Sequence, residues 1–310
     1  SGPVLYCPCC RHAFPQSESR TDAEHRAEMR KLAATTSDPI HSSSDVKPAG
    51  SDQSAVGEAG RGIMGTIAAK VLMKLLYCVR MCRPDMLRAV CHLACFVTKW
   101  DAVCDRKLHR LMCYVHSTYH FRMVGWVGDG ADVITPHLFA DADLGGCTQT
   151  QRSTAGSHLV MRGPNTCFPI AFSSKRIGCV VLSTAEAELY AGFYALRTHG
   201  ILALAFWEIV LQREYLVLEF HEDNQAMIRV MKTGRNFQMR YATRTLRLPI
   251  AWMHERFKAN DLVLNYELTA RMSAGIFTKA FTDTDKFQSA CWLINIVDPA
   301  MVQVCVHKIL

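Results

Sequence analysis

The pattern of apolar and polar positions changes near residue 123, and residues 123–282 read as a mixed α/β domain. Short β-branched and aromatic runs between turn residues indicate strands, and apolar residues every three or four positions indicate helices. Ser183, with Glu186 three residues later, forms a capping box that predicts a long helix ending near residue 212. Strands are expected at 138–142, 157–161, 167–172, 216–221 and 261–266, and shorter helices at 224–232 and 242–257.

The order of these elements predicts the fold class. Three strands in succession, then alternating helices and strands and a last helix, indicate a mixed sheet flanked by helices. Pro249 lies inside the expected helix 242–257 and should kink or split it.

The chain before residue 123 is organised differently. Apolar positions recur with a helical period from 63 to 122, which predicts three helices in a small bundle. The first 62 residues are polar and small, which is typical of a flexible arm. The predicted organisation is an N-terminal arm (1–62), a helical segment (63–122), an α/β domain (123–282) and a C-terminal tail (283–310).

The composition is typical of a chain with a buried core and argues against a membrane-spanning or secreted protein. The chain has 310 residues, of which 49% are hydrophobic and 20% charged, so it can bury a core. No uninterrupted apolar run reaches about 18 residues and no secretory signal is visible, so neither membrane contact nor secretion is expected. The 14 cysteines are scattered, with several in pairs four residues apart inside apolar helical stretches, which predicts reduced thiols and a cytoplasmic or nuclear location. Cys7 and Cys10 form one C-x-x-C pair, and without a second pair free thiols are the favoured interpretation over zinc.

Three carboxylates occupy informative positions. Asp141 lies in the first strand of the α/β domain, Glu188 one turn into the long helix, and Asp223 at the end of the fourth strand. Such acids can converge where a helix packs on a sheet, and hard oxygen ligands suit Mg²⁺ or Mn²⁺. Two such ions can activate water for phosphodiester cleavage. Spacing alone also allows a simpler interpretation, in which these are surface or helix-capping acids.

Six short segments of the α/β domain resemble, in order, the ribonuclease H domain of copia-type LTR-retrotransposon Pol polyproteins. Residues 139–146 (F-A-D-A-D-L-G-G) resemble Y-S-D-A-D-W-A-G, and 182–188 (L-S-T-A-E-A-E) resemble L-S-S-T-E-A-E. The others are 151–156, 173–176, 222–226 and 276–281, which are similar to R-R-S-T-S-G, S-S-K-K, C-D-N-Q-S-A and I-L-T-K-P-L. In the helical segment, L-L-Y at 75–77 and C-R-P-D at 82–85 resemble the C-terminal end of reverse transcriptase. The resemblance covers about residues 63–282 and is closest to divergent copies in protists.

The resemblance implies an RNase-H-like fold and hydrolysis of the RNA strand of RNA–DNA hybrids with Mg²⁺ or Mn²⁺. It implies that Asp141, Glu188 and Asp223 are catalytic, metal-binding carboxylates, with Asp143 as the rival to Asp141. No small-molecule cofactor is implied. The remaining part of the reverse transcriptase is a candidate partner.

The sequence departs from the family at its fourth carboxylate. Gly275 stands where the family has aspartate in A-D-I-L-T-K, so activity is expected to be impaired, by about 10²–10³-fold for one lost electrostatic contributor. Gly275→Asp is therefore expected to raise cleavage. No Y-x-D-D occurs, so the chain carries no polymerase site.

Basic residues follow the third carboxylate. With interleaved aromatic residues, this pattern indicates a phosphate-tracking surface for an RNA–DNA hybrid, against the simpler alternative of a solvated helix face. Three hypotheses remain: a hybrid endonuclease, a non-catalytic nucleic-acid-binding module, and an integrase-like core, which shares the fold but lacks the family's S-T-x-E-A-E element. The predicted nucleic-acid-binding residues are Arg229, Lys232, Arg235, Arg240, Arg244 and Arg247, in a run that continues to Arg256 and Lys258.

Overall fold

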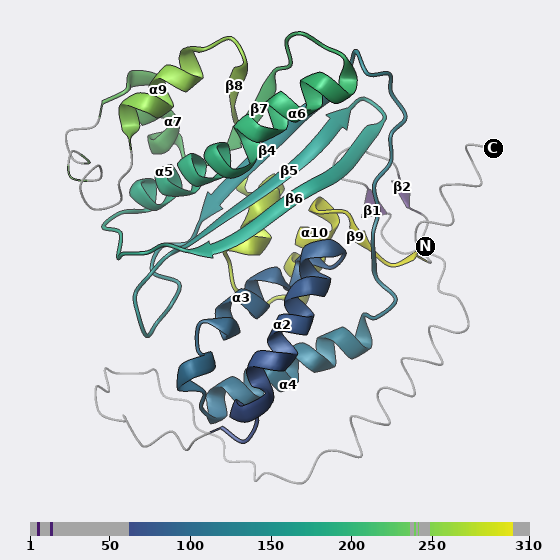
Figure 1. Ribbon diagram of the computed structural model, residues 1–310, viewed down its shortest axis with the longest axis vertical. Coiled ribbons are helices and arrows are strands. Elements are labelled where there is room, and N and C mark those ends of the chain that lie inside the picture. Colours follow the sequence, from purple (N-terminus) through teal and green to yellow (C-terminus); the bar gives the residue numbers. More distant parts are fainter. Residues whose placement is uncertain are drawn as a thin grey trace.

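A computed structural model describes residues 5–6, 13–14, 62–235, 239, 241 and 249–299 (Figure 1). The predicted arm therefore lies outside the described residues, apart from two short paired strands, β1 (Leu5–Tyr6) and β2 (Ala13–Phe14).

The helical segment contains the three expected helices, α2 (Gly65–Met81), α3 (Leu87–Ala94) and α4 (Ala102–Ser117). A short 3₁₀ turn, η1 (Pro84–Met86), leads into α3, and the Asp101 side chain caps α4 by accepting a hydrogen bond from the Cys104 backbone. Leu72 and Leu108 are fully buried between these helices. The same core includes Ile276 and Phe277, so the bundle packs on the distant end of the α/β domain.

The C-terminal segment completes this core rather than forming the expected tail from residue 283. Helix α10 (Thr284–Leu293) buries Cys291 in the helical core, and β9 (Ile296–Val297) pairs antiparallel with β3 (Arg122–Met123). The apolar residues of this segment bury surface against the bundle. The prediction of a tail from residue 283 is therefore corrected as far as Val297, because these residues belong to the folded core.

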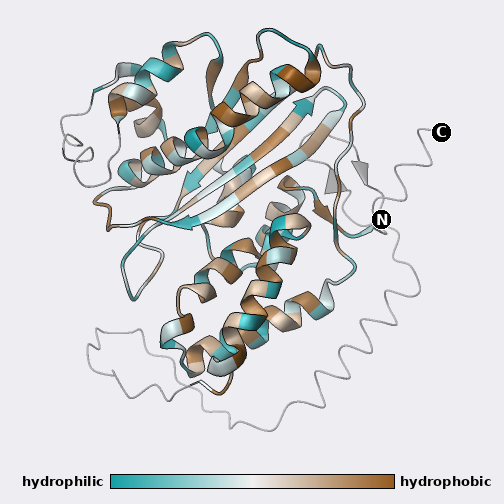
Figure 2. Ribbon diagram, viewed as in Figure 1, coloured by the Kyte–Doolittle hydropathy of each residue, from teal (hydrophilic) through white to brown (hydrophobic). Residues whose placement is uncertain are grey.

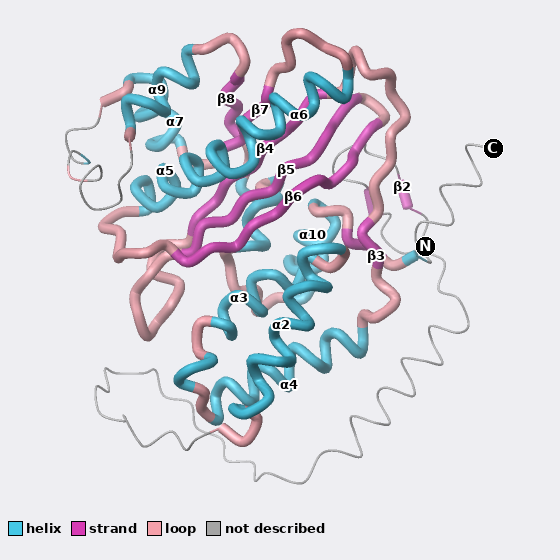
Figure 3. Tube along the Cα trace, in the orientation of Figure 1, coloured by secondary structure: helices cyan, strands magenta, loops and turns pink. Residues whose placement is uncertain are grey.

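A five-stranded mixed sheet forms the centre of the α/β domain (Figure 3). Its strands are β4 (Thr135–Ala142), β5 (Thr154–Gly163), β6 (Thr166–Arg176), β7 (Leu218–Glu222) and β8 (Leu262–Tyr266), in the order β6-β5-β4-β7-β8. The first three form an antiparallel meander, whereas β7 runs parallel to β4 and β8 parallel to β7. This strand order, with helices on both faces, is the RNase-H-like fold, and the predicted fold class is confirmed.

The long predicted helix covers one face of the sheet. It comprises α5 (Thr184–Ala195), a π-helical turn η3 (Leu196–Gly200) and α6 (Ile201–Leu211). The Ser183 hydroxyl accepts a hydrogen bond from the Glu186 backbone, as the capping box predicts. A Cβ atom on Gly192 would meet the Met227 methyl group and lie 3.3 Å from the Phe220 ring, so α5 packs closely on the sheet and on α7 at this position.

The combined helix Thr184–Leu211 is long and apolar enough to cross a membrane by length and composition, although no single apolar run suggested it. Much of α5 is buried against the sheet, which is how the core helix of a folded domain also meets this criterion. Helix α6 exposes Leu202, Phe206 and Ile209 (Figure 2).

Two shorter helices complete this layer, α7 (Gln225–Thr233) and α9 (Ile250–Lys258). Helix α9 begins directly after Pro249, which takes the N-cap position, so the proline precedes the helix instead of kinking it. The expected helical residues 242–248 lie outside the described part of the chain.

The opposite face of the sheet is covered by two 3₁₀ turns, η5 (Thr269–Arg271) and η6 (Ser273–Phe277). Because side chains alternate along β4, Leu138 and Ala140 face the core under α5, whereas Phe139 packs with Ala274 of η6. Asp141 follows the same alternation and lies beside Thr278, directly after η6.

Candidate metal centre

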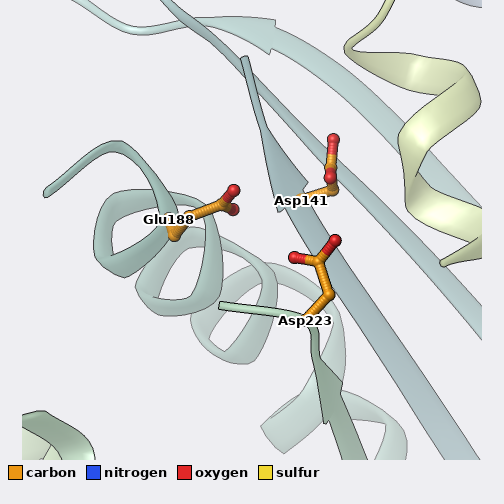
Figure 4. Close-up of side chains that lie close together, drawn as sticks. All are labelled: Asp141, Glu188 and Asp223. Carbon is orange, nitrogen blue, oxygen red and sulfur yellow. The ribbon is translucent and has the colours of Figure 1, made fainter. Parts of the chain in front are cut away.

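Three carboxylates from three elements meet at one end of the sheet (Figure 4). Strands β4 and β7 are parallel, so Asp141 near the C-terminal end of β4 and Asp223 just after β7 lie at the same end of the sheet. Helix α5 packs on β4 and places Glu188 over this end of the sheet. One oxygen of each carboxylate lies within 4.8 Å of the others. The structure thus brings together the three acids that the sequence singled out.

Asp141 is held firmly inside the fold. Its carboxylate is 1% exposed, and its Oδ2 accepts a hydrogen bond from the Thr278 hydroxyl. Its Oδ1 accepts a bond of 2.8 Å from the Lys279 ammonium. Burial raises the pKa of Asp141, and the charge of Lys279 opposes that rise.

Glu188 is a buried carboxylate with an oxygen available to bind a cation. The residue is 4% exposed, and its Oε2 has no hydrogen-bond partner among the described residues. Burial, together with Asp141 and Asp223, raises the pKa of Glu188 to about 9. An unpartnered buried carboxylate oxygen is costly, and a hard cation would satisfy it. The donor set therefore fits Mg²⁺ or Mn²⁺.

A further buried acid, Glu222, lies beside the cluster and is not among the residues predicted from the sequence. It is fully buried at the end of β7, its Oε1 accepts a bond of 3.0 Å from the Asn224 backbone, and its Oε2 has no partner in the described structure. Burial first, and then the neighbouring Glu188 carboxylate, raise the pKa of Glu222 well above its ordinary range, which favours the protonated form. The signal available in the sequence was an acid at an inward position of a strand, next to a predicted ligand.

Asp143, the rival candidate, lies outside the cluster. Strand β4 ends at Ala142, so the regular alternation that would place Asp143 beside Asp141 stops there. The Asp143 carboxylate instead accepts a 2.5 Å bond from the Thr154 backbone, and its other oxygen lies 3.7 Å from the guanidinium of Arg88. Asp143 therefore stabilises the loop after β4.

Residues around η6 set the position of Thr278 and Lys279. Gly156 lies opposite Asp141 on β5, and a Cβ there would lie 2.7 Å from the Thr278 methyl group. From the helical segment, the Arg88 guanidinium donates a 2.5 Å bond to the Thr278 carbonyl. The helical segment therefore supports one wall of the acidic cluster, which the sequence did not indicate. Gly275 is buried within η6 and supplies no carboxylate.

The predicted nucleic-acid-binding residues are only partly described. Arg229 and Lys232 are exposed on α7, and Arg235 is exposed just after it. Arg240, Arg244 and Arg247 lie outside the described residues. Arg256 pairs with Asp261 and is part of the fold of α9.

Because Glu188 is buried with a raised pKa, we expect the metal-free protein to lose stability as the pH rises from about 7 to 8.5. Glu188 has a pKa of about 9 when folded and 4.5 ordinarily, so the folded state keeps a proton that the unfolded chain has lost. The stabilisation of the folded state by this proton is fully present below pH 4.5 and is lost as the pH rises through about 9. Thermal unfolding in a chelator should show a falling midpoint across this window.

Glu188→Gln should make this decline shallower, because the amide does not titrate. Glu222 shifts stability in the same direction, so part of the decline should remain. Glu255→Gln, at an exposed position of α9, is the matched control and should decline as the wild type does. An equal decline in Glu188→Gln and the wild type would contradict the buried, proton-bearing Glu188.

The strand order and the covering helix give this part of the chain an RNase-H-like fold. No family model matches the chain. Solved structures similar to this chain include three ribonuclease H structures. RNase H1 from Halobacterium salinarum NRC-1 is 14% identical (TM-score 0.31; 45% of this chain, 90% of that one). LC11-RNase H1, isolated from compost, is 16% identical (TM-score 0.33; 46% and 92%). The N-terminal RNase H domain of Rv2228c from Mycobacterium tuberculosis is 15% identical (TM-score 0.31; 51% and 96%).

Proposed function

We propose that the chain is the ribonuclease H part of a copia-type retrotransposon polyprotein and hydrolyses the RNA strand of RNA–DNA hybrids. The observation that carries this proposal is the convergence of Asp141, Glu188 and Asp223 within 4.8 Å. The six family-like segments of the sequence support the retrotransposon origin. The helical segment resembles the end of a reverse transcriptase, and the rest of that enzyme is the partner we propose. The proposed location is cytoplasmic or nuclear.

In this proposal the three carboxylates hold Mg²⁺ or Mn²⁺, which when bound activates water and stabilises the leaving oxygen of the phosphodiester. Asp141 is fixed for this role by Thr278 and Lys279. Glu188 offers the unpartnered Oε2, and Asp223 stands at the more open side of the cluster. Burial raises the pKa of Glu222, which disfavours a further negative charge at the site.

A second candidate is a nucleic-acid-binding module without catalysis. Gly275 favours it, because this position supplies no fourth carboxylate. Binding would then survive through the basic residues that follow Asp223, whereas cleavage would be lost.

A cleavage assay separates the two candidates. The full chain is incubated with a hybrid labelled on its RNA strand, with Mg²⁺, with Mn²⁺ and with chelator. Metal-dependent cutting of the RNA strand, with single-stranded RNA and duplex DNA spared, would support the nuclease. Tight hybrid binding without cutting under any of these conditions would support the binding module, and neither cutting nor binding would contradict both.

Binding should depend steeply on salt, because phosphate contacts release counterions. Replacing Arg229 and Lys232 by alanine should weaken hybrid binding and flatten the plot of log affinity against log salt by about one unit per lost contact. Fluorescence anisotropy at several salt concentrations measures this slope. Lys286→Ala, which removes an exposed charge from α10, is the control and should keep the wild-type slope. An unchanged slope in the α7 variant would contradict the assigned surface.

A further inference from the structure

A lysine ammonium lies inside the acidic cluster. The Lys279 Nζ is 2.8 Å from Asp141 Oδ1, and its side chain is 39% exposed while that of Asp141 is 1% exposed. Burial lowers the pKa of Lys279, but the charges of Asp141, Asp223 and Glu188 outweigh it and leave the pKa raised. The ammonium is thus in direct contact with Asp141, one of the three acids.

The same ammonium lies beside the position of the missing carboxylate. A Cβ atom built on Gly275 would be 3.5 Å from the Lys279 Nζ and 3.7 Å from its Cδ. These are ordinary contact distances, so position 275 has room for a side chain, and that side chain would meet the ammonium. Position 275 and the Lys279 ammonium thus lie side by side at the site.

We propose that the Lys279 ammonium is a built-in cation that takes the place of one of two divalent ions, so that the centre binds a single divalent ion. This inference rests on the proposed metal-dependent function. When an ion displaces the proton of Glu188, the three carboxylates and the ammonium carry a net charge of −2, which one divalent ion neutralises.

The free ligand atoms agree with one ion. Both oxygens of Asp141 already accept hydrogen bonds, one from Thr278 and one from Lys279. Among the three proposed ligands, Glu188 has a buried oxygen, Oε2, without a hydrogen-bond partner in the described structure, on the side contributed by α5. A second divalent ion, typically about 4 Å from the first, would need more negative charge and would be repelled by the ammonium.

This inference changes the expectation for Gly275→Asp. The new carboxylate would face the Lys279 Nζ and pair with it, so the single substitution should restore little. A second ion should require both the added carboxylate and the loss of the ammonium.

The test counts Mn²⁺ ions bound per chain, by isothermal titration calorimetry and electron paramagnetic resonance, in the full chain without nucleic acid. The wild type and Gly275→Asp should each bind one ion. Lys279→Met should bind one ion about tenfold more tightly, because a like charge is removed. The double variant Gly275→Asp with Lys279→Met should bind two ions.

Matched variants make the result specific. Lys279→Arg keeps the charge and should bind one ion, and Lys286→Met removes a lysine outside the cluster and should match the wild type. If Lys279→Met folds poorly by circular dichroism, Lys279→Gln takes its place. Two ions in the wild type, or unchanged stoichiometry and affinity without Lys279, would overturn the inference alone. No binding by any variant would overturn the metal centre and with it the proposed function.

Discussion

Asp141→Asn is expected to lower metal-dependent cleavage of the hybrid by at least about 10²–10³-fold, the usual cost of one preorganised electrostatic contributor. The amide is isosteric with the carboxylate but carries no charge for the cation. Asp141 lies at the centre of the cluster, 1% exposed and bonded to both Thr278 and Lys279, so no neighbouring acid can move into its place. Single-turnover cleavage with Mg²⁺ and with Mn²⁺ measures the loss.

Asp143→Asn is the matched control for this variant. It makes the same change two residues later, where the carboxylate accepts a bond from Thr154 and lies outside the cluster. Its cleavage rate should stay close to that of the wild type, and both variants should keep the wild-type circular dichroism spectrum. The opposite pattern, with activity lost in Asp143→Asn alone, would make Asp143 the ligand.

Gly156→Val is expected to destabilise the fold by about 1–3 kcal/mol, the range for overpacking a filled site. A Cβ at this position would lie 2.7 Å from the Thr278 methyl group, 2.9 Å from the Ala274 carbonyl oxygen and 3.0 Å from the Phe277 Cβ. One of these contacts is with backbone, so the segment 274–278 has to move away from the sheet. Thr278 and Lys279 would then lose their bonds to Asp141, and metal binding should weaken along with stability.

Urea unfolding of Gly156→Val and Gly156→Ala measures this effect as a graded series. Gly178→Ala is the control, because a Cβ at Gly178 has no neighbour within 4 Å. That control should change stability by no more than about 0.5 kcal/mol, as surface substitutions do. A Gly156→Ala variant as stable as Gly178→Ala would contradict the close approach of η6 to β5.

Local patterns were sufficient to predict the elements and their order. The capping box at Ser183, the meander of three strands and the later alternation of helices and strands are all present. The period of apolar positions reports which face of an element is buried, and that information is local. The same patterns placed Asp141 within the first strand, Asp223 at the end of the fourth strand and Glu188 on the covering helix, which predicted their convergence. Their role as metal ligands stays a prediction.

Only the tertiary structure decided the surroundings of that cluster. The choice of Asp141 over Asp143 depends on where β4 ends, and the burial of Glu222 depends on what α5 covers. Lys279 reaches Asp141 across 138 positions of the chain, and Arg88 reaches Thr278 across 190. Such contacts follow from packing between elements that are distant in sequence, so no local period or spacing can report them. The sequence by itself determined which elements form and which acids they carry, whereas tertiary packing determined which cation those acids face.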